Sequence, residues 1–163
     1  MSEPFPEQAP RRGYRGYIAS RPVQGNRTPQ HVQNLVIRDY ALRNGLLFKL
    51  SATEHAMPHC YMMLEQVLDE LPSLEGMIVY SLFMLPQRRE RRLDVFRRVL
   101  DQGAALHTAV EGLLLAGPDD IGRLEDIRRI QEVMDRTPDP GPVLRRPLLP
   151  NSAPSNPADD PQG

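Results

Sequence analysis

The sequence predicts an α/β fold in which an open, mostly parallel four-stranded sheet is flanked by helices. Between residues 13 and 136, short strand-like runs alternate with helix-like segments, a pattern typical of parallel strands joined by right-handed crossovers. The run "GMIVYSLFML" is apolar almost throughout, as expected of a central parallel strand buried on both faces. With 163 residues and 40% hydrophobic content, the chain is long enough to form one core.

The expected elements follow in alternating order. The strands correspond to "GYRGYIAS", "LLFKLSA", "GMIVYSLFML" and "AALHTAV", and the helices to residues 28–45, 58–71, 86–103 and 119–136. In the first helix we expect Thr28 as N-cap, Pro29 as the first helical residue and Gly45 as the C-terminal stop. The side chains expected on its buried stripe are Val32, Leu35, Val36 and Tyr40.

The chain divides into three expected segments. Residues 1–12 are expected to form a disordered N-terminal tail, and residues 13–136 a single α/β domain. Residues 137–163 contain eight of the 17 prolines, so they are expected to form a disordered, proline-rich C-terminal tail.

Composition limits the function classes. The net charge of -1 and the pI near 6.4 give no global field that would attract nucleic acid or an anionic membrane. No apolar run reaches the roughly 18 residues of a membrane span, and "MSEPFPEQAP" lacks the apolar stretch of a signal peptide. A cytoplasmic protein with no membrane partner is therefore expected. Cys60 is the only cysteine, which excludes a multi-thiolate metal site within one chain. Neither GxGxxG nor GxxxxGK[ST] occurs, and no cofactor is expected.

Ligands of open α/β sheets collect at the carboxyl ends of the strands, and polar residues follow the first expected strand. Arginines beside the N-terminus of the first helix form a natural seat for phosphate or carboxylate, because helix N-termini present unpaired N–H groups. The alternative is a solvated loop whose arginines pair with acids. The candidate ligand-binding residues at this edge are Tyr17, Ser20, Arg21, Arg27, Gln30, His31 and Asn34.

The second edge carries "SATEHAMPHCY". Glu54 with His55 or His59 is a candidate acid/base pair, since histidine titrates near neutrality. Proximity in sequence is the only support for it. We expect no metal site here, because Pro58 breaks the helix that would bring His55, His59 and Cys60 onto one face.

The third edge offers Tyr80 and Ser81, which are expected to lie beside Ser20 if the first and third strands are neighbours. Their hydroxyl groups suit a sugar or a phosphate. They are equally suited to local hydrogen bonds at the end of the strand. His107, in the last expected strand, is interpreted as a packed core residue.

The segments "GYRGYI", "PQHVQNLVIRDY", "SATE" and "YSLFMLP" resemble a small bacterial family, the sporadic carbohydrate cluster proteins. The resemblance covers about residues 13–115. The family is encoded in surface-carbohydrate biosynthesis clusters, so the resemblance implies a genomic setting and no particular reaction.

The order of elements more distantly resembles the catalytic domain of serine recombinases, which implies a resolvase-like fold of flavodoxin-like topology. Ser20 matches the position of the family's nucleophilic serine, and Tyr80, Ser81 and Leu82 match its "YSLDRL" type motif. Phe83 and Met84 stand where that motif has aspartate and arginine. Strand exchange needs several arginines around the phosphate, so the resemblance supports a fold and a pocket position but not recombination.

Three functions are weighed from these residues. The first is an enzyme or binding protein for an anionic sugar, phosphosugar or sugar nucleotide in surface-carbohydrate biosynthesis, at the Ser20, Arg21 and Arg27 edge. The second is a noncatalytic partner or regulator of a biosynthetic enzyme. The third is nucleic-acid binding by a degenerate recombinase-like domain, supported only by "RRERRLDVFRR". Residues 13–136 carry 16 basic and 16 acidic side chains, so we expect no nucleic-acid partner.

Two helices carry opposite charge excesses. The last helix is rich in acids and has a narrow apolar stripe, while residues 88–98 carry an excess of arginines. Pairing of these surfaces between two copies of the chain predicts a homodimer. The alternative is that both helices pack on one sheet face of a single chain and satisfy each other there.

Overall fold

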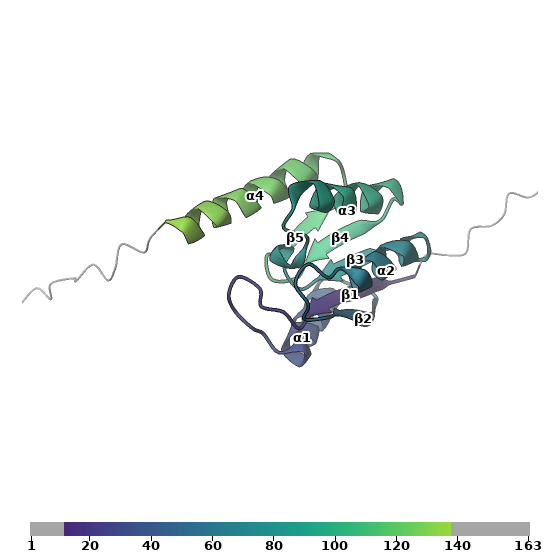
Figure 1. Cartoon of the computed structure of the whole chain (residues 1–163). Helices are drawn as coiled ribbons and strands as arrows, with labels where there is room; N and C mark the ends of the chain where they lie inside the picture. Colours follow the sequence, from purple (N-terminus) through teal and green to yellow (C-terminus); the bar gives the residue numbers. More distant parts are fainter. Residues whose placement is uncertain (1–11, 138–163) are drawn as a thin grey trace, which may run out of the picture.

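The structure is a computed structural model that describes residues 12–137 (Figure 1). Apart from Arg12 and Thr137, the two predicted tails lie outside the described residues. Among the helices of the described part, none has both the length and the apolar character that a membrane crossing demands.

A mostly parallel sheet forms the centre of the fold, as predicted. Its strand order is β2-β1-β3-β4-β5, and the first four strands along the chain are parallel. The prediction of four strands missed β5, which pairs with β4 in the antiparallel direction. It has only three residues, too few to show a period. The strands are β1 (Tyr14–Ala19), β2 (Phe48–Glu54), β3 (Gly76–Val79), β4 (Ala105–Thr108) and β5 (Leu113–Leu115).

Helices cover both faces of the sheet (Figure 1). Ile18 and Ile78 pack in a cluster with α1 (Gln30–Arg43) on one face. Tyr17 and Val79 point the other way, because alternate residues of a strand face opposite sides. On that face they join a larger core with α2 (Met62–Glu70), α3 (Arg89–Asp101) and the first turns of α4 (Asp119–Arg136).

The buried face of α1 differs from the predicted stripe. The helix begins at Gln30, one residue later than expected, and its N-cap is Pro29 in place of Thr28. Tyr40 is buried as predicted, but Leu35 is 61% exposed. The buried face of α1 is rotated from the predicted one, because the polar side chain of Gln33 is the first buried residue of the helix. The buried residues are Gln33, Ile37, Tyr40 and Ala41.

The apolar run from Gly76 does not remain a strand throughout. Strand β3 ends at Val79, and the chain turns into the short 3₁₀ helix η2 (Leu82–Met84). Another short 3₁₀ helix, η1 (Leu71–Ser73), precedes β3. Ser81 accounts for the break, since its Oγ accepts a hydrogen bond from the Phe83 N–H at 3.2 Å. In the sheet β1 lies between β2 and β3, so the carboxyl end of β1 separates those of β2 and β3.

Candidate functional site

The carboxyl edge of the sheet is organised around Glu54, the last residue of β2. Its side chain is fully buried, yet the carboxylate does not lack partners. It accepts hydrogen bonds from the backbone N–H groups of Met63 at 3.0 Å and Leu64 at 3.1 Å. These are first-turn amides of α2, whose N-cap Tyr61 supplies no side-chain acceptor. Glu54, at the end of β2, thus caps the N-terminus of the helix α2.

Tyr17 and Arg21 extend this network. The Tyr17 hydroxyl donates to Glu54 Oε2 at 3.1 Å and accepts from Arg21 at 3.3 Å. Burial raises the pKa of the Tyr17 hydroxyl, so it remains a proton donor. The guanidinium of Arg21 also donates to the carbonyl oxygens of Cys60 and Met84, and it lies 4.4 Å from the centre of the Tyr61 ring. Arg21 therefore joins three loops.

Gln33, which is not among the predicted site residues, holds the end of β1. Its amide exchanges two hydrogen bonds with the backbone of Ala19, at 2.7 and 3.2 Å, and its Nε2 also donates to the Thr28 carbonyl at 2.8 Å. The side chain is fully buried. A signal was available, because Gln33 precedes the buried Ile37 and Tyr40 by four and seven residues on one helix face.

The hydroxyl groups at this edge also take internal partners. Ser20 Oγ donates to the Glu54 carbonyl at 3.1 Å, and the Tyr80 hydroxyl donates to Thr28 Oγ1 at 3.5 Å. Ser81 Oγ donates to Glu111 at 2.6 Å. Strands β1 and β3 are neighbours, which meets the condition set for this expectation, so Ser20 and Tyr80 lie at one edge.

The remaining predicted residues are not drawn into this network. Arg27, Gln30 and His31 are exposed and Asn34 is half-buried. His55 and His59 are exposed as well, whereas the Glu54 carboxylate is buried against backbone amides. The acid/base pair of Glu54 with either histidine stays an untested prediction, and this geometry gives it no support. Within residues 12–137, no group of three or more His, Cys, Asp or Glu side chains is arranged to hold a metal ion.

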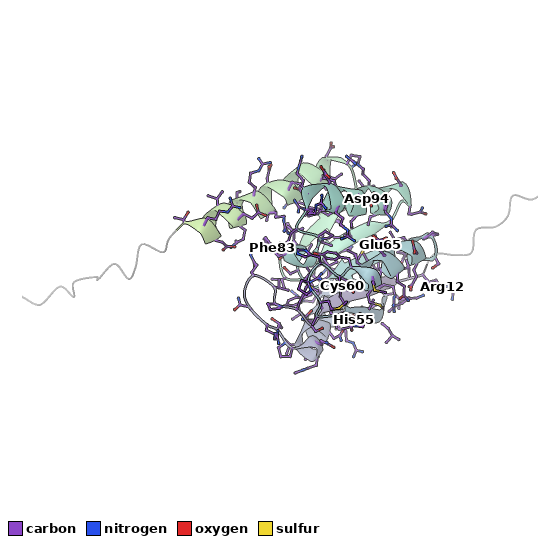
Figure 2. The ribbon with its side chains drawn as sticks, in the orientation of Figure 1. Arg12, His55, Cys60, Glu65, Phe83 and Asp94 are labelled. Carbon is purple, nitrogen blue, oxygen red and sulfur yellow. The ribbon has the colours of Figure 1, made fainter. Side chains whose placement is uncertain are left out.

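The first turn of α3 lies at the same edge and presents arginines. The side chains of Arg88 and Arg91 are exposed, and Arg91 lies 5.0 Å from the centre of the Tyr61 ring. With His59, Tyr61, Pro86 and Gln87 they line a cavity of about 270 Å³. The helix N-terminus has no side-chain cap. In Figure 2 the labelled Arg12, just before β1, lies at the right of the domain, and the labelled Phe83 lies to the left, away from it.

A larger cavity, of about 620 Å³, lies away from these residues. Arg15, Arg38, Phe48 and Leu50 are among the residues that line it, and no predicted site residue does. Arg15 is held there by Glu70 at 3.1 Å and by the Leu50 carbonyl at 2.8 Å.

The opposite charges of α3 and α4 meet within one chain. Arg92 donates to both carboxylate oxygens of Glu125, at 2.6 and 2.7 Å, and Arg89 lies 3.8 Å from the same carboxylate. Hydrogen bonding from Arg92 lowers the pKa of the Glu125 carboxyl. The charge complementarity from which a homodimer was predicted is therefore used inside the molecule, and the homodimer has no support.

Comparison with solved structures identifies the fold. A resolvase family site-specific recombinase from Streptococcus pneumoniae matches with a TM-score of 0.52 at 13% identity, covering 76% of this chain and 91% of that one. The fold is resolvase-like. The N-terminal catalytic domain of TP901-1 integrase also matches, with a TM-score of 0.46 at 15% identity, covering 74% of this chain and 95% of that one. No family model and no curated protein matches the sequence.

These findings correct the main functional prediction. The protein was predicted to be an enzyme or binder of an anionic sugar or sugar nucleotide, with a partner of a biosynthetic enzyme as the alternative. The sugar reading is wrong, because the solved structure that matches with a TM-score of 0.52 is a site-specific recombinase, and the noncatalytic alternative stays a prediction. The prediction of no nucleic-acid partner is wrong for the same reason. The resemblance to the sporadic carbohydrate cluster family finds no support.

Proposed function

We propose that residues 13–136 form a domain that binds the phosphate backbone of DNA without cutting it. The observation that carries the proposal is the first turn of α3, where an uncapped helix N-terminus and the exposed Arg88 and Arg91 face the carboxyl edge of the sheet. Unpaired N–H groups and guanidinium groups both suit phosphate oxygens. The likeness to a site-specific recombinase agrees with a nucleic-acid ligand.

Arg91 is positioned by its surroundings. Its guanidinium packs over the buried Tyr61, and Arg21 lies over the same ring at 4.4 Å. An arginine held on an aromatic face loses less side-chain freedom on binding than a solvated one. His59 lines the same cavity, and it is one of two non-glycine residues among 12–137 with a positive φ, at 58°. The loop before α2 therefore contributes to the surface that Arg88 and Arg91 form.

Ser20 is poorly placed to attack a phosphate. Its hydroxyl donates to the Glu54 carbonyl, an acceptor that takes no proton from it. Arg21 follows it directly but is bonded to three protein oxygens. Phe83 and Met84 supply no charge. A group transfer at phosphate needs a base for the nucleophile, and the Ser20 hydroxyl has none as its partner, while the adjacent Arg21 is held by protein oxygens.

The test is DNA binding by fluorescence anisotropy with a short labelled duplex, at salt concentrations between about 50 and 200 mM. We expect salt-dependent binding that is weakened at least tenfold in the double variant Arg88→Ala, Arg91→Ala. Each lost phosphate contact should also flatten the plot of log affinity against log salt by about one. A supercoiled plasmid incubated with the protein should stay intact, with no adduct on Ser20.

The matched control is Arg43→Ala. Arg43 is an exposed arginine at the far end of α1, paired only with Asp39 at 2.8 Å among its described contacts. It removes one positive charge from the chain but leaves α3 unchanged, so it should bind the duplex as the wild type does. Binding that is absent at low salt, or equal in the double variant and the wild type, would refute the proposal.

A further inference from the structure

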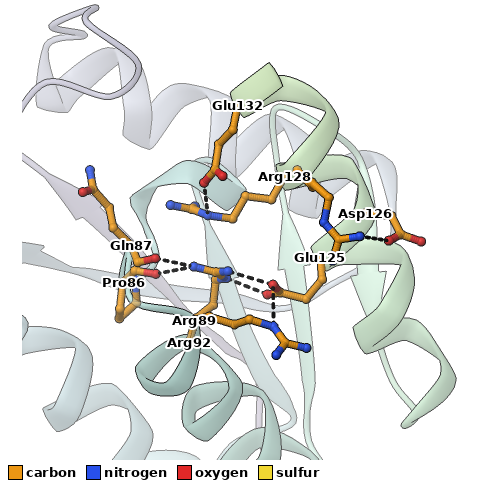
Figure 3. Close-up of polar contacts among 9 residues, drawn as sticks. Pro86, Gln87, Arg89, Arg92, Glu125, Asp126, Arg128 and Glu132 are labelled. Atoms are coloured by element: carbon orange, nitrogen blue, oxygen red, sulfur yellow. Dashed lines mark hydrogen bonds and ion pairs between the residues drawn. The ribbon is translucent and has the colours of Figure 1, made fainter. Parts of the chain in front are cut away.

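Two buried arginines lie side by side between α3 and α4, in different electrostatic situations (Figure 3). All three guanidinium nitrogens of Arg92 donate hydrogen bonds. Besides its two bonds to Glu125, it donates to the carbonyl oxygens of Pro86 at 2.9 Å and Gln87 at 2.8 Å. Such a fork fixes both the side chain and the turn that leads into α3.

Arg128, on α4, is equally buried but poorly paired. It is 5% exposed, and neither its Nε nor its Nη1 has a hydrogen-bond partner within residues 12–137. Glu132 Oε1 lies 3.4 Å from Nε, close enough for an ion pair but not in hydrogen-bond geometry, and Glu132 is about half exposed. Burial and the adjacent charge of Arg92 lower the pKa of Arg128. A buried cation in this state is costly unless a further anion joins it.

A cavity of about 190 Å³ opens at this place. The lining includes four arginines and two glutamates, which leaves a surplus of two positive charges. Asp126 lies 3.9 Å from Arg129, but both are about 70% exposed, so water screens that pair. The lining residues are Gln87, Arg89, Arg92, Glu125, Arg128, Arg129 and Glu132.

We propose that this cavity is a phosphate site in which Arg128 is the central ligand. Arg89 and Arg129, which are largely exposed, close over the anion, and Gln87 supplies an amide donor. A phosphate group matches the site better than a carboxylate because its charge balances the surplus of two and its oxygens accept several guanidinium forks at once. Glu125 stays with Arg92 and excludes the anion from that side.

The phosphate has two sources, free phosphate and the DNA backbone. Gln87 also lines the cavity of Arg88 and Arg91, so the two cavities flank one residue. A DNA strand that contacts Arg88 and Arg91 would therefore pass close to Arg128. The phosphate site does not rest on the proposed function, because inorganic phosphate alone tests it.

The experiment titrates the full chain with inorganic phosphate by calorimetry, in a chloride buffer of constant ionic strength. The wild type should bind one phosphate, and Arg128→Met should raise its Kd at least tenfold, since a bond to a charged group is worth more than that factor. Arg43→Met is the matched control, because Arg43 is an exposed arginine that lines neither cavity, and it should keep the wild-type Kd. If Arg128→Met fails to fold, Arg89→Met and Arg129→Met, at exposed positions, should each weaken phosphate several-fold.

A second arm repeats the duplex titration with Arg128→Met. Weaker duplex binding would identify the DNA backbone as the source of the phosphate, and unchanged duplex binding with lost inorganic phosphate would identify free phosphate. Both results support the site. Equal phosphate affinity in the wild type and the Arg128 or Arg89 variants, or no phosphate binding by the wild type, would overturn it, whatever the duplex does.

Discussion

The two polar clusters of this molecule, one around Glu54 and one around Arg128, are built in opposite ways. The Glu54 carboxylate accepts bonds from Tyr17 and from two backbone amides of α2. Arg128 is buried to a similar degree, yet two of its nitrogens have no hydrogen-bond partner within residues 12–137. A charge whose bonds are all made inside the chain holds the fold together, while one left incomplete has capacity for a ligand.

That contrast changes where a ligand is sought. The carboxyl edge at β1 and β2 carries most of the predicted binding residues, but Tyr17, Arg21 and Ser20 donate their hydrogen bonds to acceptors within the protein. The arginines that are available to bind an anion line two cavities around the first turn of α3, and Gln87 lines both cavities. Polar composition alone does not distinguish these two cases, because both clusters are rich in charged side chains.

The contrast is tested most strongly by Glu54→Ala. The change leaves the Met63 and Leu64 amides and the Tyr17 hydroxyl without their buried acceptor. We expect the free energy of unfolding to fall by about 4 kcal/mol, as in other buried networks that lose one charged member. Urea denaturation measures it.

Asp69→Ala is the control for a lost carboxylate. Asp69 also lies on α2 and pairs with Arg98 at 3.1 Å, but its side chain is 77% exposed. Its loss should cost less than about 1 kcal/mol. Equal stabilities for the Glu54 and Asp69 variants would mean that the Glu54 network is not what holds α2 to the sheet.

The fold could be predicted from the sequence to a useful depth, and the failures have physical causes. Alternation of strands and helices predicted the parallel sheet, and the resemblance to serine recombinases implied the flavodoxin-like topology in which β1 and β3 are neighbours. The role of Glu54 was hidden because its partners lie nine and ten residues further on, in another element. One clue existed, since "PHCYMM" has no Ser, Thr, Asp or Asn to cap the helix that it begins.

The burial of Arg128 was harder to foresee. The apolar stripe of α4 includes Leu124 and Ile127, and Arg128 lies one turn beyond Leu124 on the same side of the helix. Sequence periodicity treats an arginine at such a position as a solvated charge. Its burial depends on how α3 packs against α4 through Arg92 and Glu125, which are 33 residues apart. Long-range packing of this kind leaves no local pattern.

Removing the charge of Arg128 should have the opposite effect on stability from removing that of Glu54. In phosphate-free buffer, Arg128→Met should leave the free energy of unfolding unchanged or raise it by about 1 kcal/mol, because an incompletely paired buried cation is replaced by an apolar chain of similar length. Arg92→Met should instead cost about 3 kcal/mol, since it strips Glu125 of its buried partner. Urea unfolding of both variants compares them directly. A large loss of stability for Arg128→Met would show that its present contacts are already sufficient.

The smallest effect concerns His107, a buried group that is intermediate between the two clusters because it has one partner. The Tyr40 hydroxyl lies 2.8 Å from its Nδ1, and Tyr14 packs against the ring edge-on. Burial lowers the pKa of His107 below its ordinary 6.5, so the unfolded chain takes up the proton first. Its contribution to stability is thus present above about pH 6.5 and is lost as the pH falls toward the folded-state pKa.

Unfolding free energies measured between neutral and mildly acidic pH should therefore fall with decreasing pH, with a slope from this one proton of at most about 1.4 kcal/mol per pH unit. His107→Phe removes the titrating group, so its slope should be shallower than that of the wild type by this contribution. Tyr40→Phe keeps the buried imidazole and removes only the hydrogen bond, so it should keep the wild-type slope, because burial is the cause of the shift. If Tyr40→Phe flattened the profile as much as His107→Phe, the hydroxyl and not burial would control the proton, and His107 would belong with Glu54 among the groups governed by their partners.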